Sequence, residues 1–134
     1  MNETMVTLSG WVGSEVTVRQ AGDAEVAEFR VAATPRRYQR QTDSWVDGDT
    51  QWFSVKAWRR LGENCARSLH SGDPVVVHGR LTATTWTNSA GIGVTSFDVD
   101  AQFVGHDLSR GTSVFTKAAK PEGESEQVAE STAA

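Results

Sequence analysis

The sequence is poor in cysteine, with Cys65 as its only thiol among 134 residues. Neither an internal disulfide nor a cysteine-rich zinc site can form, which suits a reducing compartment, and an intersubunit disulfide through Cys65 is the less favoured alternative. No apolar run approaches the roughly 18 residues that a membrane span needs. Residues 1–6 also lack the basic and apolar segments of a signal peptide. We therefore expect a cytoplasmic protein that does not enter a membrane.

Basic residues are not in excess either, since 13 Lys and Arg stand against 17 Asp and Glu, a net charge of −4. Nucleic-acid binders usually carry a basic excess. Residues 117–134 hold two Lys and four Glu, which gives −2, and residues 1–116 hold 11 basic and 13 acidic residues, which also gives −2. Local clusters remain, and such clusters are often only solvated surface. They are Arg36, Arg37 and Arg40, and then Lys56, Arg59 and Arg60.

Alternation of apolar and polar residues predicts β-strands along most of the chain. The five expected strands span residues 5–12, 26–34, 50–58, 74–86 and 94–104, with residues 15–19 extended as well. The stretch 36–49 is polar and rich in turn residues, which predicts a long hairpin loop. Residues 59–70 place Leu61, Cys65 and Leu69 at helical spacing, and they form the one expected helix.

Five strands with a helix between the third and the fourth are typical of the oligonucleotide-binding (OB) fold, an all-β five-stranded Greek-key barrel. We expect this domain to span residues 1–116. Leu108, Val114 and Phe115 would support a short terminal strand at its end. Residues 117–134 show no periodicity and are rich in Glu, Ser and Ala, which predicts a disordered polar tail.

The strand 50–58 carries tryptophans among polar residues. Its side chains alternate, so Trp52, Lys56 and Trp58 share one face while Val55 and Ala57 share the other, which is a good core face. Aromatic rings beside a cation can stack unpaired bases, each worth about 1–3 kcal/mol, and the cation can bind phosphate. The two tryptophans are six residues apart, or about 20 Å, so the ligand would be a long single strand without sequence preference.

Two further aromatics follow the same pattern. Trp86 lies on the same face of its strand as Thr84 and Arg80, and this face is polar. Tyr38 lies within the first arginine cluster. We expect Tyr38, Trp52, Trp58 and Trp86 to stack bases. The expected phosphate contacts are Arg36, Arg37, Arg40, Lys56, Arg59 and Arg80.

The other two tryptophans, Trp11 and Trp45, are assigned to structural packing, because Trp11 ends a strand near apolar residues and Trp45 stands alone in the loop. Tryptophan and arginine are also enriched at subunit interfaces. An OB-fold module for protein interaction or assembly, with its aromatics buried between subunits, is therefore the alternative to a DNA-binding surface.

Motifs for catalysis are absent from the sequence. His70, His78 and His106 are scattered, and Asp98 and Asp100 share a face of a hairpin strand that we expect to face water. There is no phosphate-binding glycine motif and no nucleophile elbow. We expect a protein that is not an enzyme and that needs neither a metal nor a cofactor.

The chain resembles the bacterial single-stranded DNA-binding protein (SSB) family from Met1 to about Phe115. The resemblance is carried by VTLSGWVG at 6–13, FRVAATPR at 29–36, WFSVKAWR at 52–59 and GDPVVVHGRL at 72–81. It places the base-stacking aromatics of the family on Tyr38, Trp52, Trp58 and Trp86. It also implies a homotetramer, associated with the nucleoid, around which single-stranded DNA is wound in replication, recombination and repair.

Two segments, 36–48 and 107–117, are most similar to the actinobacterial type, in which an extra terminal strand clamps neighbouring subunits. The principal SSB of a bacterium ends in an acidic cluster with a terminal Pro-Phe that docks onto other enzymes, whereas this sequence ends in ESTAA. We therefore expect a paralogue that does not recruit repair and replication enzymes through its tail, with a specialised role in DNA uptake or chromosome segregation. A merely solubilising tail is the alternative.

Overall fold

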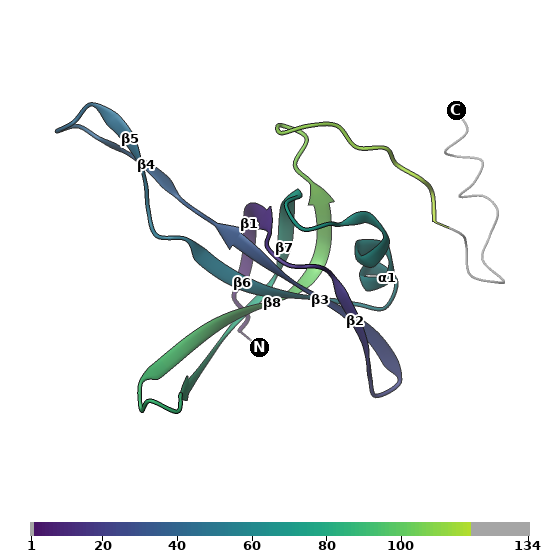
Figure 1. Cartoon of the computed structure of the whole chain (residues 1–134). Helices are drawn as coiled ribbons and strands as arrows, with labels where there is room; N and C mark the ends of the chain where they lie inside the picture. Colours follow the sequence, from purple (N-terminus) through teal and green to yellow (C-terminus); the bar gives the residue numbers. More distant parts are fainter. Residues whose placement is uncertain (1, 119–134) are drawn as a thin grey trace.

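Strands dominate residues 2–118, the part of the chain that the computed structural model describes (Figure 1). The elements are β1 (Met5–Val12), β2 (Thr17–Ala21), β3 (Ala24–Ala33), β4 (Arg36–Gln39), β5 (Ser44–Asp47), β6 (Gln51–Trp58), α1 (Arg59–Ser68), β7 (Pro74–Thr87) and β8 (Gly93–His106). No helix in this part of the chain is long and apolar enough to cross a membrane.

The main sheet closes into a barrel. Its strand order is β1-β7-β8-β6-β3-β2, and β1 also pairs with β3 through Trp11 and Val12. The first strand of the barrel is broken into β1 and β2, which both run antiparallel to β3, so six segments form five barrel strands. The helix lies between the third and the fourth of these strands, β6 and β7, as the sequence predicts.

Valine is the commonest residue in the core, as the alternating pattern predicts. The core side chains that are at most 2% exposed are Val12, Val26, Ala27, Phe29, Val31, Val55, Ala57, Val75, Val77 and Val99. The helix α1 packs against this core with Cys65, and Leu69, directly after the helix, does the same. Gly62 permits the close approach, because a Cβ there would overlap the carbonyl oxygen of Ala57. Burial raises the pKa of the Cys65 thiol to about 11, and a buried, protonated thiol argues against an intersubunit disulfide.

Two hairpins project from the barrel on the side away from α1 (Figure 1). One is the far half of β7 and β8. The other is the ribbon of β4 and β5, in which the predicted hairpin loop 36–49 pairs as two short strands. Tyr38 lies opposite Trp45 there with 5.6 Å between ring centroids, and Arg36 forms an ion pair with Asp47. These cross-strand contacts order a segment that the polar composition predicted to be a loop.

The helix ends at Ser68, two residues before the predicted end, and Asp73 then accepts a hydrogen bond from the backbone N–H of His70. The short strand expected around residues 108–115 is not formed within the described chain. Residues 107–118 make a turn and then run without a pairing strand, and a strand exists only where another pairs with it. A clamp between subunits stays a prediction. The predicted disordered tail lies almost entirely in residues 119–134, outside the described residues.

Candidate nucleic-acid interface

All four predicted stacking aromatics are exposed in the single chain. Tyr38 is 45%, Trp52 44%, Trp58 40% and Trp86 46% exposed. None of them belongs to the barrel core, because Val55, Val75 and Val77 fill it from the opposite faces of β6 and β7, while no residue of β4 is buried. Packing inside the fold therefore does not account for these four aromatic residues. They are available for contact either with DNA or with another subunit.

The central part of this surface is the outward side of β3, β6 and β8, here called the outer face. Its side chains are Glu28, Arg30 and Ala32 on β3, Trp52, Ser54, Lys56 and Trp58 on β6, and Asp98 and Asp100 on β8. Positive and negative groups alternate on it. The outer face is therefore not a uniformly basic surface, and it carries one indole ring near each end of β6.

Two neighbours fix the orientation of the Trp52 indole, Gly13 at its edge and Arg30 over one ring face. A Cβ at Gly13 would lie 2.5 Å from Cζ3 of the indole, so the ring packs directly on the glycine backbone. The guanidinium of Arg30 lies 4.7 Å from the ring centroid, at the distance of a cation–π contact. At the other end of β6, the indole N–H of Trp58 donates to Asp100 over 3.5 Å. Both rings are thus oriented by neighbours while remaining accessible.

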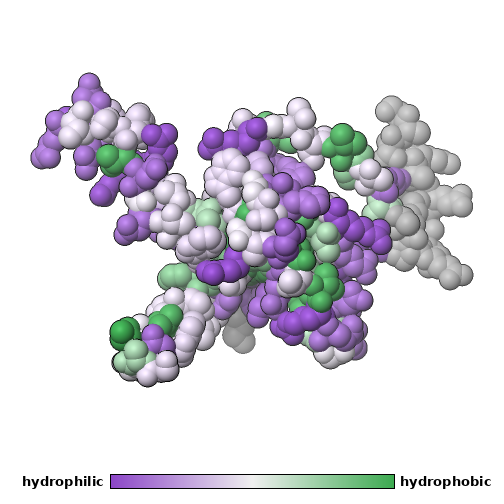
Figure 2. Space-filling model, viewed as in Figure 1, coloured by the Kyte–Doolittle hydropathy of each residue, from purple (hydrophilic) through white to green (hydrophobic). Residues whose placement is uncertain are grey.

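The two projecting hairpins carry the other aromatics. Tyr38 stands on β4, edge-on to Trp45 at an interplanar angle of 70°. Trp86 is near the end of β7, opposite Val94 on β8. Figure 2 shows apolar surface at the tip of the β7–β8 hairpin, where Ile92 is 62% exposed, and largely hydrophilic surface on the β4–β5 ribbon. Each hairpin therefore extends an aromatic surface beyond the barrel.

The predicted phosphate contacts fall into two groups. Arg36 is paired with Asp47 at 3.1 Å, and Arg80 with Asp100 at 2.8 Å and Glu3 at 3.8 Å. The hydrogen bond and charge of Asp100 raise the pKa of Arg80 above its ordinary value. The second group makes no ion pair within residues 2–118 and consists of Arg37, Arg40, Lys56 and Arg59. These four are better placed for phosphate than Arg36 and Arg80.

Trp11 and Trp45, which the sequence pattern assigns to structural packing, do not fill the barrel core, although Trp45 packs edge-on against Tyr38. Trp11 is 44% and Trp45 60% exposed. The parity of Trp11 with Thr7 and Ser9 was the available signal, since these residues alternate with Val6 and Leu8, which pack against the core. Arg30 was also missed, because its place over Trp52 depends on the register between β3 and β6.

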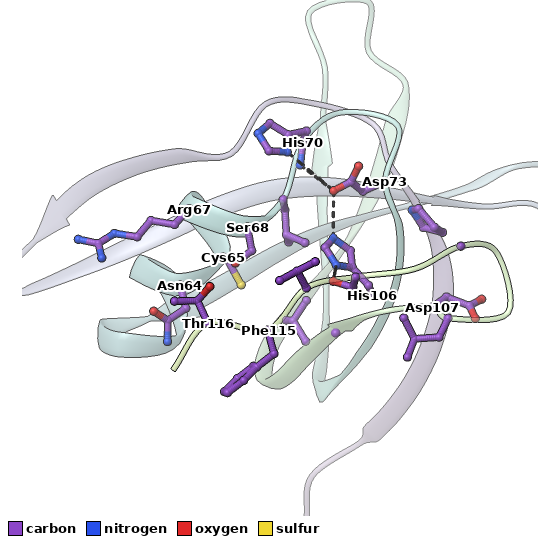
Figure 3. A pocket seen from close by; sticks show the side chains of 18 of the residues that line it. Asn64, Cys65, Arg67, Ser68, His70, Asp73, His106, Asp107, Phe115 and Thr116 are labelled. Carbon is purple, nitrogen blue, oxygen red and sulfur yellow. Dashed lines mark hydrogen bonds and ion pairs between the residues drawn. The ribbon is translucent and has the colours of Figure 1, made fainter. Parts of the chain in front are cut away.

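A groove of about 1190 Å³ lies on another part of the molecule, between α1 and residues 107–118. Figure 3 shows Asp73 between His70 and His106 at its rim. His106 Nε2 is 3.1 Å from the Asp73 carboxylate, and His106 Nδ1 is 2.8 Å from the hydroxyl of Ser113. The contacts fasten the terminal segment to the barrel. Among the described residues, no cluster of His, Cys, Asp and Glu could hold a metal ion.

Comparison with known proteins gives one consistent result. The model of the single-strand binding protein family matches residues 3–107. Single-stranded DNA-binding protein 2 of Streptomyces avermitilis is 45% identical over 124 residues, which cover 92% of this chain and 78% of that protein. Single-stranded DNA-binding protein 1 of Streptomyces coelicolor is 43% identical over 122 residues, covering 91% and 78%.

Solved structures agree with the sequence relatives. The crystal structure of the small single-stranded DNA-binding protein from Streptomyces coelicolor has a TM-score of 0.73 at 41% identity, covering 83% of this chain and all of that one. The second single-stranded DNA-binding protein of Mycobacterium smegmatis has a TM-score of 0.64 at 31% identity, covering 87% of this chain and all of its own.

Proposed function

The chain belongs to the single-strand binding protein family, and we propose that it binds single-stranded DNA by stacking bases on Tyr38, Trp52, Trp58 and Trp86. It acts as a binding protein and not as an enzyme. One observation carries the proposal: Trp52 and Trp58 are 44% and 40% exposed on the outer face, although Val55 and Ala57 of the same strand are buried in the core.

Stacking explains the expected selectivity. Every base has a π-face, so rings held in place accept any sequence. Bases inside a duplex already stack on one another and do not offer these faces. The protein should therefore prefer unpaired DNA and show little preference between bases.

Phosphate contacts come first from Arg37, Arg40, Lys56 and Arg59. Arg36 and Arg80 contribute after exchanging Asp47 and Asp100 for phosphate, which costs them existing ion pairs. Exposed ion pairs are worth at most about 1 kcal/mol, so this exchange is feasible.

We further propose a homotetramer of these barrels. Support comes from apolar side chains that the single chain leaves exposed, namely Phe103 (55%), Leu108 (66%), Val114 (93%) and Phe115 (87%). The last three lie in the segment 107–118, which lacks a strand partner and is available to clamp a neighbour. Such an assembly would wind and protect single-stranded DNA on the nucleoid in the cytoplasm, in replication, recombination or repair, or in a specialised role in DNA uptake or chromosome segregation.

The test removes the two rings of β6. Trp52→Ala with Trp58→Ala should weaken binding to oligothymidine by at least about 30-fold, since two stacked bases are lost and each is worth about 1–3 kcal/mol. Val18→Ala is the control, because Val18 is 46% exposed on β2, outside the outer face. Affinity would be read by fluorescence anisotropy of labelled oligothymidine, and the fold by circular dichroism.

The alternative is an assembly module whose aromatics are covered by other subunits. Tryptophan fluorescence separates the two functions, because base stacking quenches the indoles on titration with oligothymidine. An unchanged fluorescence signal, or a preference for duplex DNA, would reject the stacking mechanism.

A further inference from the structure

Trp11 lies in line with Trp52 across three strands. In the register of the sheet, Trp11 of β1 is opposite Ala32 of β3, and Ala32 is opposite Trp52 of β6. Opposed residues in antiparallel strands point to the same side, and neighbouring strands are about 4.8 Å apart. The two tryptophans therefore rise from one side of the sheet about 10 Å apart, with only the small side chain of Ala32 between their strands.

Trp52 itself reaches toward the strand of Trp11. Its indole packs on Gly13, which is two residues after Trp11. Gly13 also donates its N–H to the carbonyl of Arg30, over 2.7 Å, and Arg30 places its guanidinium over the same indole. The surface of Trp52 is thus continuous with the end of β1.

Trp11 has a cation of its own. The guanidinium of Arg110 lies 5.5 Å from the Trp11 ring centroid. A turn fixes the position of Arg110, because its N–H donates to the carbonyl of Asp107, while the N–H of Asp107 donates to Pro74, the residue opposite Trp11. The Asp107 side chain also accepts two hydrogen bonds from Ser109 within this turn. The pairing of Trp11 with Arg110 repeats that of Trp52 with Arg30.

We propose that Trp11 and Arg110 form an additional nucleotide subsite, which extends the single-stranded DNA path from Trp52 across β3 to β1. Trp11 stacks a base, and Arg110 binds the adjacent phosphate. The subsite rests on the proposed function, since it lengthens the same binding surface. It also makes the turn 107–110 part of the DNA contact.

The first test compares Trp11→Ala and Trp11→Phe with Trp52→Ala. Trp11→Ala should weaken oligothymidine binding by about tenfold, and Trp11→Phe, which keeps an aromatic ring, by less than about threefold. If Trp52→Ala weakens binding and Trp11→Ala does not, the subsite is rejected while the proposed function stands. If neither substitution weakens binding, the proposed function itself fails.

A second test uses the unaltered protein, so that folding of the variants is not at issue. Oligothymidine carrying 5-iodouracil would be crosslinked by irradiation, and the attached peptides mapped by mass spectrometry. We expect a crosslink at Trp11, and absence of any crosslink there would overturn the proposal. If Trp11→Ala changes the oligomeric state of the protein, and no crosslink to Trp11 forms, this ring contacts a second copy of the chain.

The phosphate contact of Arg110 is tested by a substitution that removes its charge. Arg110→Gln should reduce the slope of log K against log salt by about 0.7, the share of one phosphate on a single strand. Arg67→Gln, an exposed position in the last turn of α1, makes the same charge change and is the control. Equal slopes for the two variants would remove Arg110 from the subsite.

Discussion

Trp52 illustrates how one residue can be both fixed and available. Arg30 covers part of the ring through a cation–π contact worth about 0.5–1 kcal/mol at an exposed site. A stacked base is worth about 1–3 kcal/mol, so a base can displace the guanidinium. The displaced cation would remain next to the strand and could bind its phosphate. Arg30 therefore keeps the ring oriented without blocking the ligand.

Gly13→Ala tests this orientation without removing any binding group. The new Cβ would lie 2.5 Å from the far end of the Trp52 indole, which has to shift, while the fold tolerates movement at the tip of a side chain. We expect the affinity for oligothymidine to fall about fivefold, by the loss of part of one stacking contact. Gly105→Ala, whose Cβ meets nothing within 4 Å, is the control in the same anisotropy assay. An affinity as high as that of the control would show that the contact with Gly13 does not position the ring.

For single residues, the sequence predicts well that Trp52 and Trp58 are exposed, but it predicts the ion-pair partners of charged side chains poorly. Alternation within β6 is enough to place Trp52 and Trp58 on the outward side, and their exposed fractions confirm it. The partners of Arg36 and Arg80 could not be predicted, because their carboxylates are 11 and 20 residues away along the chain. For Trp11 the two signals disagree: alternation along the strand favours exposure, whereas its position at the end of a strand near apolar residues favours packing.

Among the elements, β8 places a negative charge at the centre of the outer face. Asp100 is opposite Lys56 of β6 and Arg80 of β7, and it also accepts the indole N–H of Trp58. Its carboxylate holds Arg80 at 2.8 Å and repels any phosphate that passes over β6. Asp100 thus opposes DNA binding while it orients two of the groups expected to take part in it.

Asp100→Asn should therefore strengthen binding. The amide releases Arg80 and removes one charge that repels phosphate, while it can still accept the hydrogen bond from Trp58. We expect an affinity for oligothymidine about threefold higher at low salt, with the gain fading as salt screens the charges. Glu25→Gln makes the same charge change at an exposed position of β3 opposite Gln20 and should leave the affinity within about 1.5-fold of the unaltered protein. Weaker binding by Asp100→Asn would mean that positioning Trp58 and Arg80 outweighs the repulsion.

The strands themselves were largely predictable because one face of each is buried. Period-two patterns predicted β1 with its observed ends and β3, β6, β7 and β8 to within a few residues. The ribbon of β4 and β5 was not predicted, since neither of its faces is buried and its pairing depends on cross-strand contacts such as that of Tyr38 with Trp45. The closure of the barrel through β1 and β3 involves only two residue pairs and leaves no pattern in the sequence.

For the whole molecule, the net charge of −4 has to be reconciled with a polyanionic ligand. Charges separated by more than about 8–10 Å are largely screened at physiological salt, so a phosphate responds mainly to its immediate neighbours. Among the predicted phosphate contacts, the four without an ion pair in residues 2–118 lie on the β4–β5 ribbon and along β6 to the start of α1, close to the aromatics. Acidic residues elsewhere act weakly at that distance.

The salt dependence of binding should therefore report the local cations and not the net charge. If Arg37, Arg40, Lys56 and Arg59 each bind one phosphate, these four together contribute about −3 to the slope of log K against log salt, at roughly 0.7 for each single-strand phosphate. Arg37→Gln with Arg40→Gln should make the slope shallower by about 1.4. Oligothymidine titrations between 50 and 400 mM NaCl, about an eightfold range, would measure this slope. A slope near zero would mean that stacking alone holds the strand, because a net-acidic surface without phosphate contacts releases no counterions on binding.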